Sequence, residues 1–462
     1  MNSDTDISSL KITIMGLGLH GGGLASTIFF AERGAQLTVT DLRDKTTLQP
    51  VIDKLNKYKI TYVLGEHREE DFLDADLVIK NPAVPLSSPF LKLAKQIETD
   101  ISIFLKFNKR PIIAVTGSKG KSTTVSAIFD VLHQIKPETK LGGNITTSPL
   151  TFIDDCTDKN NTPVILELSS WQLADLKDKK LLIPQISVIT NIMPDHQNRY
   201  SSMDEYISDK KLIYKNQTSA DLMICNYDDP YGKIFASETT AKVYFVSANF
   251  LPETLEGAYI LNKEGYTRIN GCEEKVLDIE ITISGEHNRL NLLYAALVLK
   301  LSNIPTEIIY SKLKMFTGIP HRMELVTTRN NVTWYNDSAA TIPQATAAAL
   351  RGAGKPVRLI AGGTDKKLDF NGTIDAFSLA RSIYLLKGSA TERLTVLLDS
   401  KNIPYKGPYN DLESVIKDVE FESRRGESVI FSPGATSFGM FNNEFDRGNQ
   451  FKQMVLDLPF FP

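Results

Sequence analysis

Residues 111–126 read PIIAVTGSKGKSTTVS, and this stretch decides the fold. Its apolar, β-branched start predicts a buried strand that ends at Thr116–Gly117, and a helix is predicted to begin near Lys121. The helix is expected to pack through one face, formed by Val125, Ile128, Phe129, Leu132 and Ile135. A strand, a glycine loop and a helix in this order predict a loop that binds phosphate groups.

Each residue type in this loop suits a nucleoside triphosphate. Gly117 and Gly120 let backbone N–H groups close on phosphate oxygens, and the start of the helix adds a partial positive charge. Lys121 is placed to reach the β- and γ-phosphates, and Ser122 can put its hydroxyl on Mg²⁺. The full pattern has a further glycine where Val115 stands. The alternative is a glycine-rich turn with a lysine that binds no ligand.

A second glycine loop, GLGLHG at residues 16–21, follows the predicted strand KITIM and opens a helix that reaches Arg33, with Gly34 at its C-cap. Asp41 ends the next predicted strand. This is the pattern of a dinucleotide-binding unit, with a pyrophosphate over the helix start and the acidic residue on a sugar or base. The motif does not separate NAD from another pyrophosphate compound, and a purely structural tight turn is the alternative.

Two further strand ends carry polar side chains. Glu167 lies near the end of VILEL (residues 164–168), where a buried carboxylate is costly unless it meets a cation, most simply Mg²⁺. Capping, or pairing with a lysine, is the alternative.

Asp195 and His196 follow the predicted strand ISVITNI (residues 186–192), at the carboxyl edge where ligands bind in open α/β sheets. Taken alone, a histidine at such a place is more often structural.

Downstream, one stripe of a predicted helix is formed by Tyr206, Lys210, Ile213 and Tyr214. This places Lys210 inward and turns Lys211 away. An inward lysine near metal and phosphates could pair with a phosphate or be modified, and a snorkelling lysine is the alternative.

Composition excludes several classes of protein. A chain of 462 residues is too long for one core, and its 42% hydrophobic and 23% charged residues are typical of a soluble protein. The net charge of −3 gives no basic face for nucleic acid. Three scattered cysteines (Cys156, Cys225, Cys272) form neither a disulfide framework nor a zinc motif, which fits a reducing cytoplasm. No signal peptide or membrane-spanning run is expected.

Strands alternate with helices almost throughout, which predicts an α/β fold with largely parallel sheets. The first unit closes near Ile103 after the strand LVIKNPAV (residues 77–84), and the central unit runs to about Pro320, with a helix near residues 284–301. The third unit begins with HRMELV, contains the strands VRLIAGG and SVIFSPG, and ends in a helix.

Together these motifs resemble the Mur ligase family, the ATP-dependent amide-bond-forming enzymes of peptidoglycan precursor assembly. The resemblance covers essentially the whole chain and is carried by GLGLHG, TGSKGKST, GGN (142–144), LELSSWQL, DHQNRY, EYISDKKLIY, GEHNRLN (285–291), PHRME, YNDS and FSPGATSFG. The LELSSWQL stretch and the GLGL start favour the branch that joins D-glutamate to UDP-N-acetylmuramoyl-L-alanine.

The resemblance implies three domains: a Rossmann-like domain for the UDP substrate (residues 1–103), a P-loop domain for ATP (104–320) and a Rossmann-like domain for the amino acid (321–462). The implied UDP-substrate contacts are Leu17, Gly18, Leu19, His20, Gly21, Asp41, Arg43, Asn81, Asn144 and His196. The implied ATP contacts are Gly117, Ser118, Lys119, Gly120, Lys121, Ser122, Thr123, Asn291, Arg322 and Asp337.

The implied D-glutamate contacts are Thr341, Lys366, Ser437 and Phe445. Two Mg²⁺ ions are implied, held by Ser122, Glu167, His196 and an N-carboxylated Lys210, and the implied catalytic set is Lys121, Asn144, Glu167, His196 and Lys210. The resemblance also implies a cytoplasmic monomer that acts through an acyl phosphate and needs neither nucleic acid nor membrane.

Three departures from the family pattern fall on the amino-acid site. Ala339 stands where the family often has lysine, Glu444 aligns with its phenylalanine and Phe445 follows one place on, and the loop GGTDKKLDF has diverged around Lys366. Two rivals follow. A folylpolyglutamate synthetase should lack the UDP-binding unit, and an NAD-dependent dehydrogenase would leave TGSKGKST idle. A non-catalytic nucleotide-binding protein is a third possibility if the amino-acid site is lost.

Overall fold

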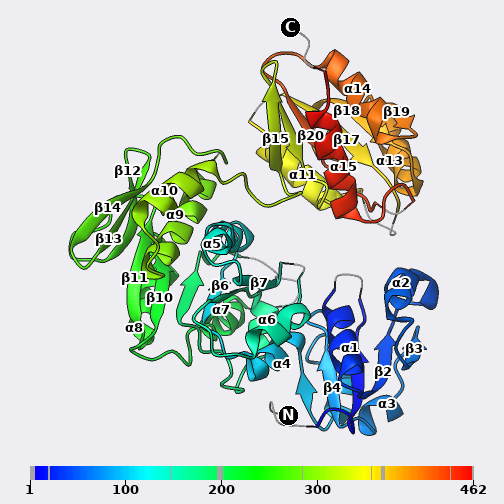
Figure 1. The fold of residues 1–462 in the computed structure, drawn as a ribbon. Helices are drawn as coiled ribbons and strands as arrows, with labels where there is room; N and C mark the ends of the chain where they lie inside the picture. Colours follow the sequence, from blue (N-terminus) through cyan, green and yellow to red (C-terminus); the bar gives the residue numbers. More distant parts are fainter. Residues whose placement is uncertain are drawn as a thin grey trace. The chain divides into compact units, whose positions relative to one another are not determined.

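The computed structural model describes residues 6–18, 21–145, 147–194, 200, 202–283, 285–354, 356–365, 370–437 and 439–459. Within these residues the chain is an α/β protein with three largely parallel sheets (Figure 1). It divides into two compact units, Met1–Phe316 and Thr317–Pro462. The predicted fold class is confirmed.

The first sheet has the order β3-β2-β1-β4-β5, and all its pairs are parallel. Its strands are β1 (Lys11–Met15), β2 (Gln36–Asp41), β3 (Ile60–Leu64), β4 (Leu77–Lys80) and β5 (Ile97–Glu98). Its helical segments are α1 (Gly22–Glu32), α2 (Lys45–Ile52), η1 (Asp53–Leu55), α3 (Glu70–Leu73) and η2 (Pro89–Leu93). Helix α1 packs on β1 and β2, so the glycine loop lies between a strand end and a helix start (Figure 1).

The second sheet has the order β14-β13-β12-β11-β10-β9-β6-β8-β7. Its strands are β6 (Ile112–Thr116), β7 (Lys140–Gly143), β8 (Val164–Glu167), β9 (Ile186–Ile189), β10 (Leu222–Asn226), β11 (Lys242–Ser247), β12 (Gly257–Leu261), β13 (Glu264–Ile269) and β14 (Cys272–Leu277). The pairs from β7 to β12 are parallel, and β12–β14 form an antiparallel extension. The phosphate-loop strand β6 is therefore flanked on both sides by parallel strands.

The helical segments of this part are α4 (Asp100–Phe107), α5 (Lys121–Ile135), η3 (Pro149–Cys156), α6 (Ser170–Ala174), α7 (Met203–Lys211), α8 (Pro230–Glu238), α9 (Glu286–Leu301) and α10 (Thr306–Met315). Helices α5 and α9 pack against each other, and α4 packs on η3. One hydrophobic core contains side chains of both the first sheet, such as Ile12, and the second, such as Leu166. The predicted boundary between residues 103 and 104 falls inside α4, and the three-domain division stays a prediction.

The third sheet has the order β15-β16-β20-β17-β18-β19, parallel except for the β15–β16 pair. Its strands are β15 (Glu324–Arg329), β16 (Val332–Asn336), β17 (Val357–Gly362), β18 (Ala380–Leu386), β19 (Lys406–Tyr409) and β20 (Ser428–Phe431). Its helices are α11 (Pro343–Gly352), α12 (Ile374–Phe377), α13 (Ser389–Ser400), α14 (Leu412–Glu422) and α15 (Glu444–Leu456).

Several local predictions are confirmed and others are corrected. Helix α5 begins at Lys121 as predicted, but Ile135 is 39% exposed, because the packed face instead continues through Ala127 and Val131. Helix α7 ends at Lys211, so Ile213 and Tyr214 lie beyond it, although both are buried. The strand predicted to reach Ile192 ends earlier, at Ile189, and the strand predicted to end at Asn81–Pro82 ends at Lys80. Pro82 has no backbone N–H to donate to the second of these ladders.

Candidate active site

The phosphate loop follows the central strand β6, and its two glycines are required by close contacts. Gly117 has φ 142° and Gly120 has φ 86°, a conformation that side chains rarely adopt. A Cβ at Gly117 would lie 2.0 Å from Thr190 Oγ1, and one at Gly120 would lie 2.2 Å from Asn291 Oδ1. The loop therefore passes against the end of β9 and against helix α9.

The end of β9 holds the loop by hydrogen bonds. The Lys119 amide donates to Asn191 Oδ1 at 2.9 Å, and Thr190 Oγ1 donates to the Lys119 carbonyl at 2.6 Å. Ser118 Oγ donates to the Met193 carbonyl at 3.0 Å. The loop is thus preorganised in the protein itself, which lowers the entropy cost of closing on a phosphate.

Two lysines converge on this loop. Lys121 Nζ donates to the carbonyls of Gly117 and Ser118, each at 3.0 Å. Lys210 Nζ, 1% exposed, donates to the same Gly117 carbonyl at 2.8 Å and lies 4.6 Å from the centre of the Tyr206 ring. Two ammonium groups at one carbonyl concentrate positive charge where an anionic ligand would enter. The inward direction predicted for Lys210 agrees with this burial, whereas Lys211 is partly exposed and pairs with Glu238.

Glu167 lies directly beside this loop. Strand β8 pairs with β6 so that Glu167 is opposite Val115, and its side chain is 1% exposed. Its Oε1 accepts a hydrogen bond from Asn144 Nδ2 at 2.9 Å, while the buried Oε2 has no hydrogen-bond partner among the described residues. A buried carboxylate oxygen without a partner is costly, and carboxylate oxygens are ligands that Mg²⁺ prefers. The side chain therefore fits a hard cation.

Asn144 is fixed against Glu167. The Asn144 amide donates to the Glu167 carbonyl at 2.8 Å, and a Cβ at Gly143 would lie 2.1 Å from that carbonyl oxygen.

The described residues contain no cluster of three His, Cys, Asp or Glu side chains that could hold a metal. The predicted ligand His196 lies outside the described residues, so the predicted second metal position is not described.

The N-terminal glycine loop has left-handed glycines at Gly16, Gly18 and Gly21. Asp41 is buried, and its carboxylate accepts from the amides of Gly18 and Arg43, each at 3.0 Å. In this structure Asp41 thus braces the loop backbone.

The neighbouring predicted UDP contacts differ in exposure. The side chain of Leu17 is fully buried, so only its backbone could contact a ligand at the loop. Arg43 is half-exposed. Asn81 Nδ2 donates to the Gly16 carbonyl at 3.3 Å. Leu19 and His20 lie outside the described residues.

In the third unit, Asp337 and Ser437 are buried. Asp337 accepts from Ser432 Oγ at 2.6 Å and from the Met323 amide at 3.0 Å, and burial raises its pKa to about 6. Ser437 Oγ is buried without a hydrogen-bond partner among the described residues. Ser437 lines a cavity of about 350 Å³ together with Gly362, Gly363, Gly388 and Arg447.

This cavity lies where β17, β18 and β20 end, the edge at which ligands bind in parallel sheets. Thr341 is half-buried, and Phe445 is 43% exposed and lies 5.5 Å from the His321 ring. Arg322 is exposed, and Lys366 lies outside the described residues.

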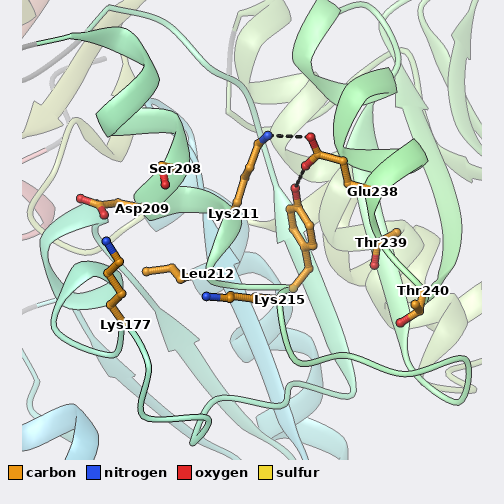
Figure 2. Close-up of a pocket in the computed structure, with 10 residues that line it drawn as sticks. Lys177, Ser208, Asp209, Lys211, Leu212, Lys215, Glu238, Thr239 and Thr240 are labelled. Carbon is orange, nitrogen blue, oxygen red and sulfur yellow. Dashed lines mark hydrogen bonds and ion pairs between the residues drawn. The ribbon is translucent and has the colours of Figure 1, made fainter.

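A second groove of about 350 Å³ lies elsewhere, along α7 and the end of α8 (Figure 2). Figure 2 shows Lys211 paired with Glu238, at 2.7 Å, while the ammonium of Lys177 points toward Asp209. None of the predicted site residues lines it. This groove is therefore not the candidate active site.

Several residues that build the site were not identified as such from the sequence. Tyr206 was expected only as part of a packed stripe, yet its hydroxyl lies 2.9 Å from Ser118 Oγ. Tyr294, fully buried in α9, donates to the Thr190 carbonyl at 2.7 Å. A hydroxyl in an otherwise apolar helix face is the signal that could have identified Tyr294, because a buried tyrosine usually finds a partner.

Comparisons with known proteins agree with this geometry. Residues 115–299 match the Mur ligase middle domain, and residues 10–103 match the MurD-like N-terminal domain of Mur ligases. The chain is 42% identical to a UDP-N-acetylmuramoylalanine--D-glutamate ligase from Borreliella afzelii, covering 97% of this chain and 98% of that protein. It is 38% identical to the protein of the same name from Treponema pallidum, covering 96% and 97%.

Among solved structures, the UDP-N-acetylmuramate-alanine ligase of Thermotoga maritima matches with a TM-score of 0.56 at 19% identity, covering 97% of this chain and 99% of that chain. This similarity concerns the fold. In the described part of the chain, no helix combines the length and the apolar character needed to span a bilayer.

Proposed function

Because the chain belongs to the Mur ligase family, we propose that it joins D-glutamate to UDP-N-acetylmuramoyl-L-alanine, using ATP and releasing ADP and phosphate. The family is one of ATP-dependent amide ligases that generally use Mg²⁺. The observation that carries the proposal is the pairing of a preorganised phosphate loop with Glu167, whose buried Oε2 has no partner among the described residues. The names of the two relatives supply the substrates.

We propose that Glu167 and the Ser122 hydroxyl hold one Mg²⁺, and that His196 with an N-carboxylated Lys210 holds a second. The bound metal would neutralise charge on the transferring phosphate. Support for the first position is the unpartnered Oε2 of Glu167.

Support for modification of Lys210 is the crowding of two cations at the Gly117 carbonyl. Carboxylation replaces the ammonium by an anion with two oxygens of the kind Mg²⁺ prefers.

The reaction needs no Ser or Cys nucleophile, because the substrate's own carboxylate attacks the γ-phosphorus. The bond from that phosphorus to the β–γ bridging oxygen breaks, and ADP and an acyl phosphate form. Lys121 stabilises the charge on the transferring group, which is most of what phosphoryl transfer asks of a protein. The D-glutamate amine then attacks the acyl carbon, loses a proton, and the C–O bond breaks to release phosphate. Asn144 is proposed to line the reacting end.

We propose residues for three ligand sites. The UDP moiety is assigned to residues 17–21, Asp41, Arg43 and Asn81, with Asn144 and His196 toward the reacting end. The nucleotide ATP is assigned to residues 117–123, with Asn291, Arg322 and Asp337. D-Glutamate is assigned to Thr341, Lys366, Ser437 and Phe445, and the unpartnered Oγ of Ser437 in its cavity supports a polar ligand there. A cytoplasmic monomer is proposed as well.

The test is phosphate release from ATP with UDP-N-acetylmuramoyl-L-alanine and a panel of amino acids. D-Glutamate should give the fastest release, and Lys121→Ala should abolish it while UDP-sugar binding persists. Calorimetry should detect binding of the UDP-sugar and none of NAD. Release that is equal for every amino acid, or micromolar NAD binding without UDP-sugar binding, would contradict the proposal.

A further inference from the structure

Lys80 is a fully buried cation next to the N-terminal glycine loop. It ends strand β4, is 1% exposed, and its Nζ lies 2.9 Å from Asp175 Oδ2. Asp175 is the residue that caps α6 and is itself buried. The pair therefore joins the first sheet to the segment that follows β8, the strand carrying Glu167.

The same ammonium shapes the turn that follows β4. Lys80 Nζ donates to the Val84 carbonyl at 2.9 Å and to the Asn81 carbonyl at 3.3 Å. Three acceptors around one ammonium fix the path of residues 81–84, because each carbonyl must point toward the same atom.

That turn packs directly on the glycine loop. A Cβ at Gly16 would lie 3.0 Å from Asn81 Cβ, and Asn81 Nδ2 donates to the Gly16 carbonyl. Gly16, Gly22, Lys80 and Asn81 line one narrow gap that has no room for a water molecule. A displacement of the turn would therefore displace the loop.

Stability alone does not account for this pair. Burying an ammonium and a carboxylate incurs a desolvation penalty that often matches or exceeds their attraction, so such pairs are weak evidence for stability. The hydrogen bonds from Lys80 instead indicate that its role is to place the turn at residues 81–84.

We propose that Lys80 is a positioning residue that holds the start of the glycine loop, residues 16–18, in the conformation that binds the UDP moiety, using Asp175 as its anchor. This inference rests on the proposed function, since it takes the glycine loop as the UDP site. Lys80 does not contact the ligand; it acts through Asn81 and Gly16.

The chain offers a matched control. Lys179, which follows α6, also joins that segment to the first sheet. Its Nζ donates to the Ile97 carbonyl and to Glu98 Oε2, each at 2.8 Å. These partners lie on β5, the edge strand beyond β4 from the glycine-loop strand β1. Lys179→Met should therefore affect folding without affecting the loop.

The experiment measures binding of UDP and of a non-hydrolysable ATP analogue by calorimetry. Lys80→Met/Asp175→Asn removes both charges, so neither is left buried alone. UDP should bind about tenfold to a hundredfold more weakly, as for a misplaced binding group, while the ATP analogue binds as in the unchanged protein. Lys179→Met should bind both ligands normally.

If the double variant does not fold, Asp175→Asn alone decides, because it keeps the carbonyl partners of Lys80 and frees only its anchor. It should still weaken UDP binding and not ATP-analogue binding. UDP binding at normal strength in a folded variant overturns the positioning role. Failure of the unchanged protein to bind UDP instead overturns the assignment of the glycine loop in the proposed function, and this inference with it.

Discussion

At the scale of single residues, the site depends on charged side chains close to the phosphate loop. Glu167 keeps one oxygen without a hydrogen-bond partner among the described residues, and Lys210 shares the Gly117 carbonyl with Lys121. A buried carboxylate oxygen without a partner is unfavourable and becomes favourable when a cation meets it, and two lysines at one carbonyl favour an anionic ligand beside them. These side chains therefore mark the positions where ligands are proposed.

Lys210 gives the first prediction. Lys210→Ala should be nearly inactive, because the proposed carbamate supplies oxygen ligands to the second Mg²⁺, and added formate or acetate should partly restore phosphate release. Lys211→Ala is the control: this neighbour is partly exposed and pairs with Glu238, so its loss should leave activity close to normal. Full activity of Lys210→Ala without added carboxylate would rule out the carbamate role.

At the scale of elements, the glycine loops were predictable and their supports were not. The start of α5 at Lys121 follows from local sequence, because a β-branched run, glycines and an amphipathic stretch each have a strong local preference. Contacts from distant elements, such as Tyr294 to Thr190 and Asn191 to Lys119, have no local signal. Strand β3 was also missed, although its sequence ITYVL is rich in strand-forming residues; it is an edge strand that buries only Val63.

The site residues show the same limit. The sequence places Glu167 and Lys210 in the interior, and both are buried. It assigns Asp41 to a sugar or base, and it does not reveal that the same carboxylate accepts hydrogen bonds from two backbone amides. These backbone contacts come from the fold of the loop and have no signal in the sequence, and the ligand contact stays a proposal.

Gly120 gives a prediction at the scale of the loop. Gly120→Ala should weaken ATP binding roughly 5- to 150-fold, because overpacking against Asn291 costs about 1–3 kcal/mol. Gly271→Ala is the control, since Gly271 also has a positive φ, 73°, but nothing lies within 4 Å of its added Cβ. Calorimetry with an ATP analogue separates the two. Equal affinities in both variants would show that the contact with Asn291 does not shape the loop.

At the scale of the whole molecule, each unit has hydrophobic cores of its own and a sheet edge that is a candidate for ligand binding. The first unit carries both glycine loops, and the second carries the cavity with Ser437. The fold class could be predicted because strands alternate with helices along the whole chain. The departures at Ala339 and Glu444 concern the third sheet's edge, where Ser437 keeps an unpartnered hydroxyl among the described residues.

Asp337 gives a prediction for the stability of the second unit. Burial raises its pKa from 3.8 to about 6, so the folded unit prefers the neutral acid. Its contribution to the free energy of unfolding is therefore greatest below pH 4, falls as the pH rises from about 4 to 6, and is constant above. The fall is about 3 kcal/mol, because the folded and unfolded pKa values differ by about two and each pKa unit corresponds to about 1.36 kcal/mol.

Calorimetric melting at several pH values checks this. The stability of Asp337→Asn relative to the unchanged protein should rise between pH 4 and 6 and then level off. Asp446→Asn is the control with the opposite sign, because hydrogen bonds from the Asn442 amide lower the pKa of Asp446 and its ionised form stabilises the fold. If the stability difference between Asp337→Asn and the unchanged protein does not vary with pH, the raised pKa of Asp337 is contradicted.

The central claim is that the phosphate loop activates a substrate carboxylate as an acyl phosphate, and an oxygen label tests it most directly. UDP-N-acetylmuramoyl-L-alanine carrying ¹⁸O in both carboxylate oxygens is incubated with ATP, Mg²⁺ and D-glutamate, and the released phosphate is analysed by mass spectrometry. The attacking carboxylate oxygen stays on phosphorus when the amide forms. The account predicts one ¹⁸O atom in each phosphate and one in the new amide. Phosphate that contains no ¹⁸O would contradict it.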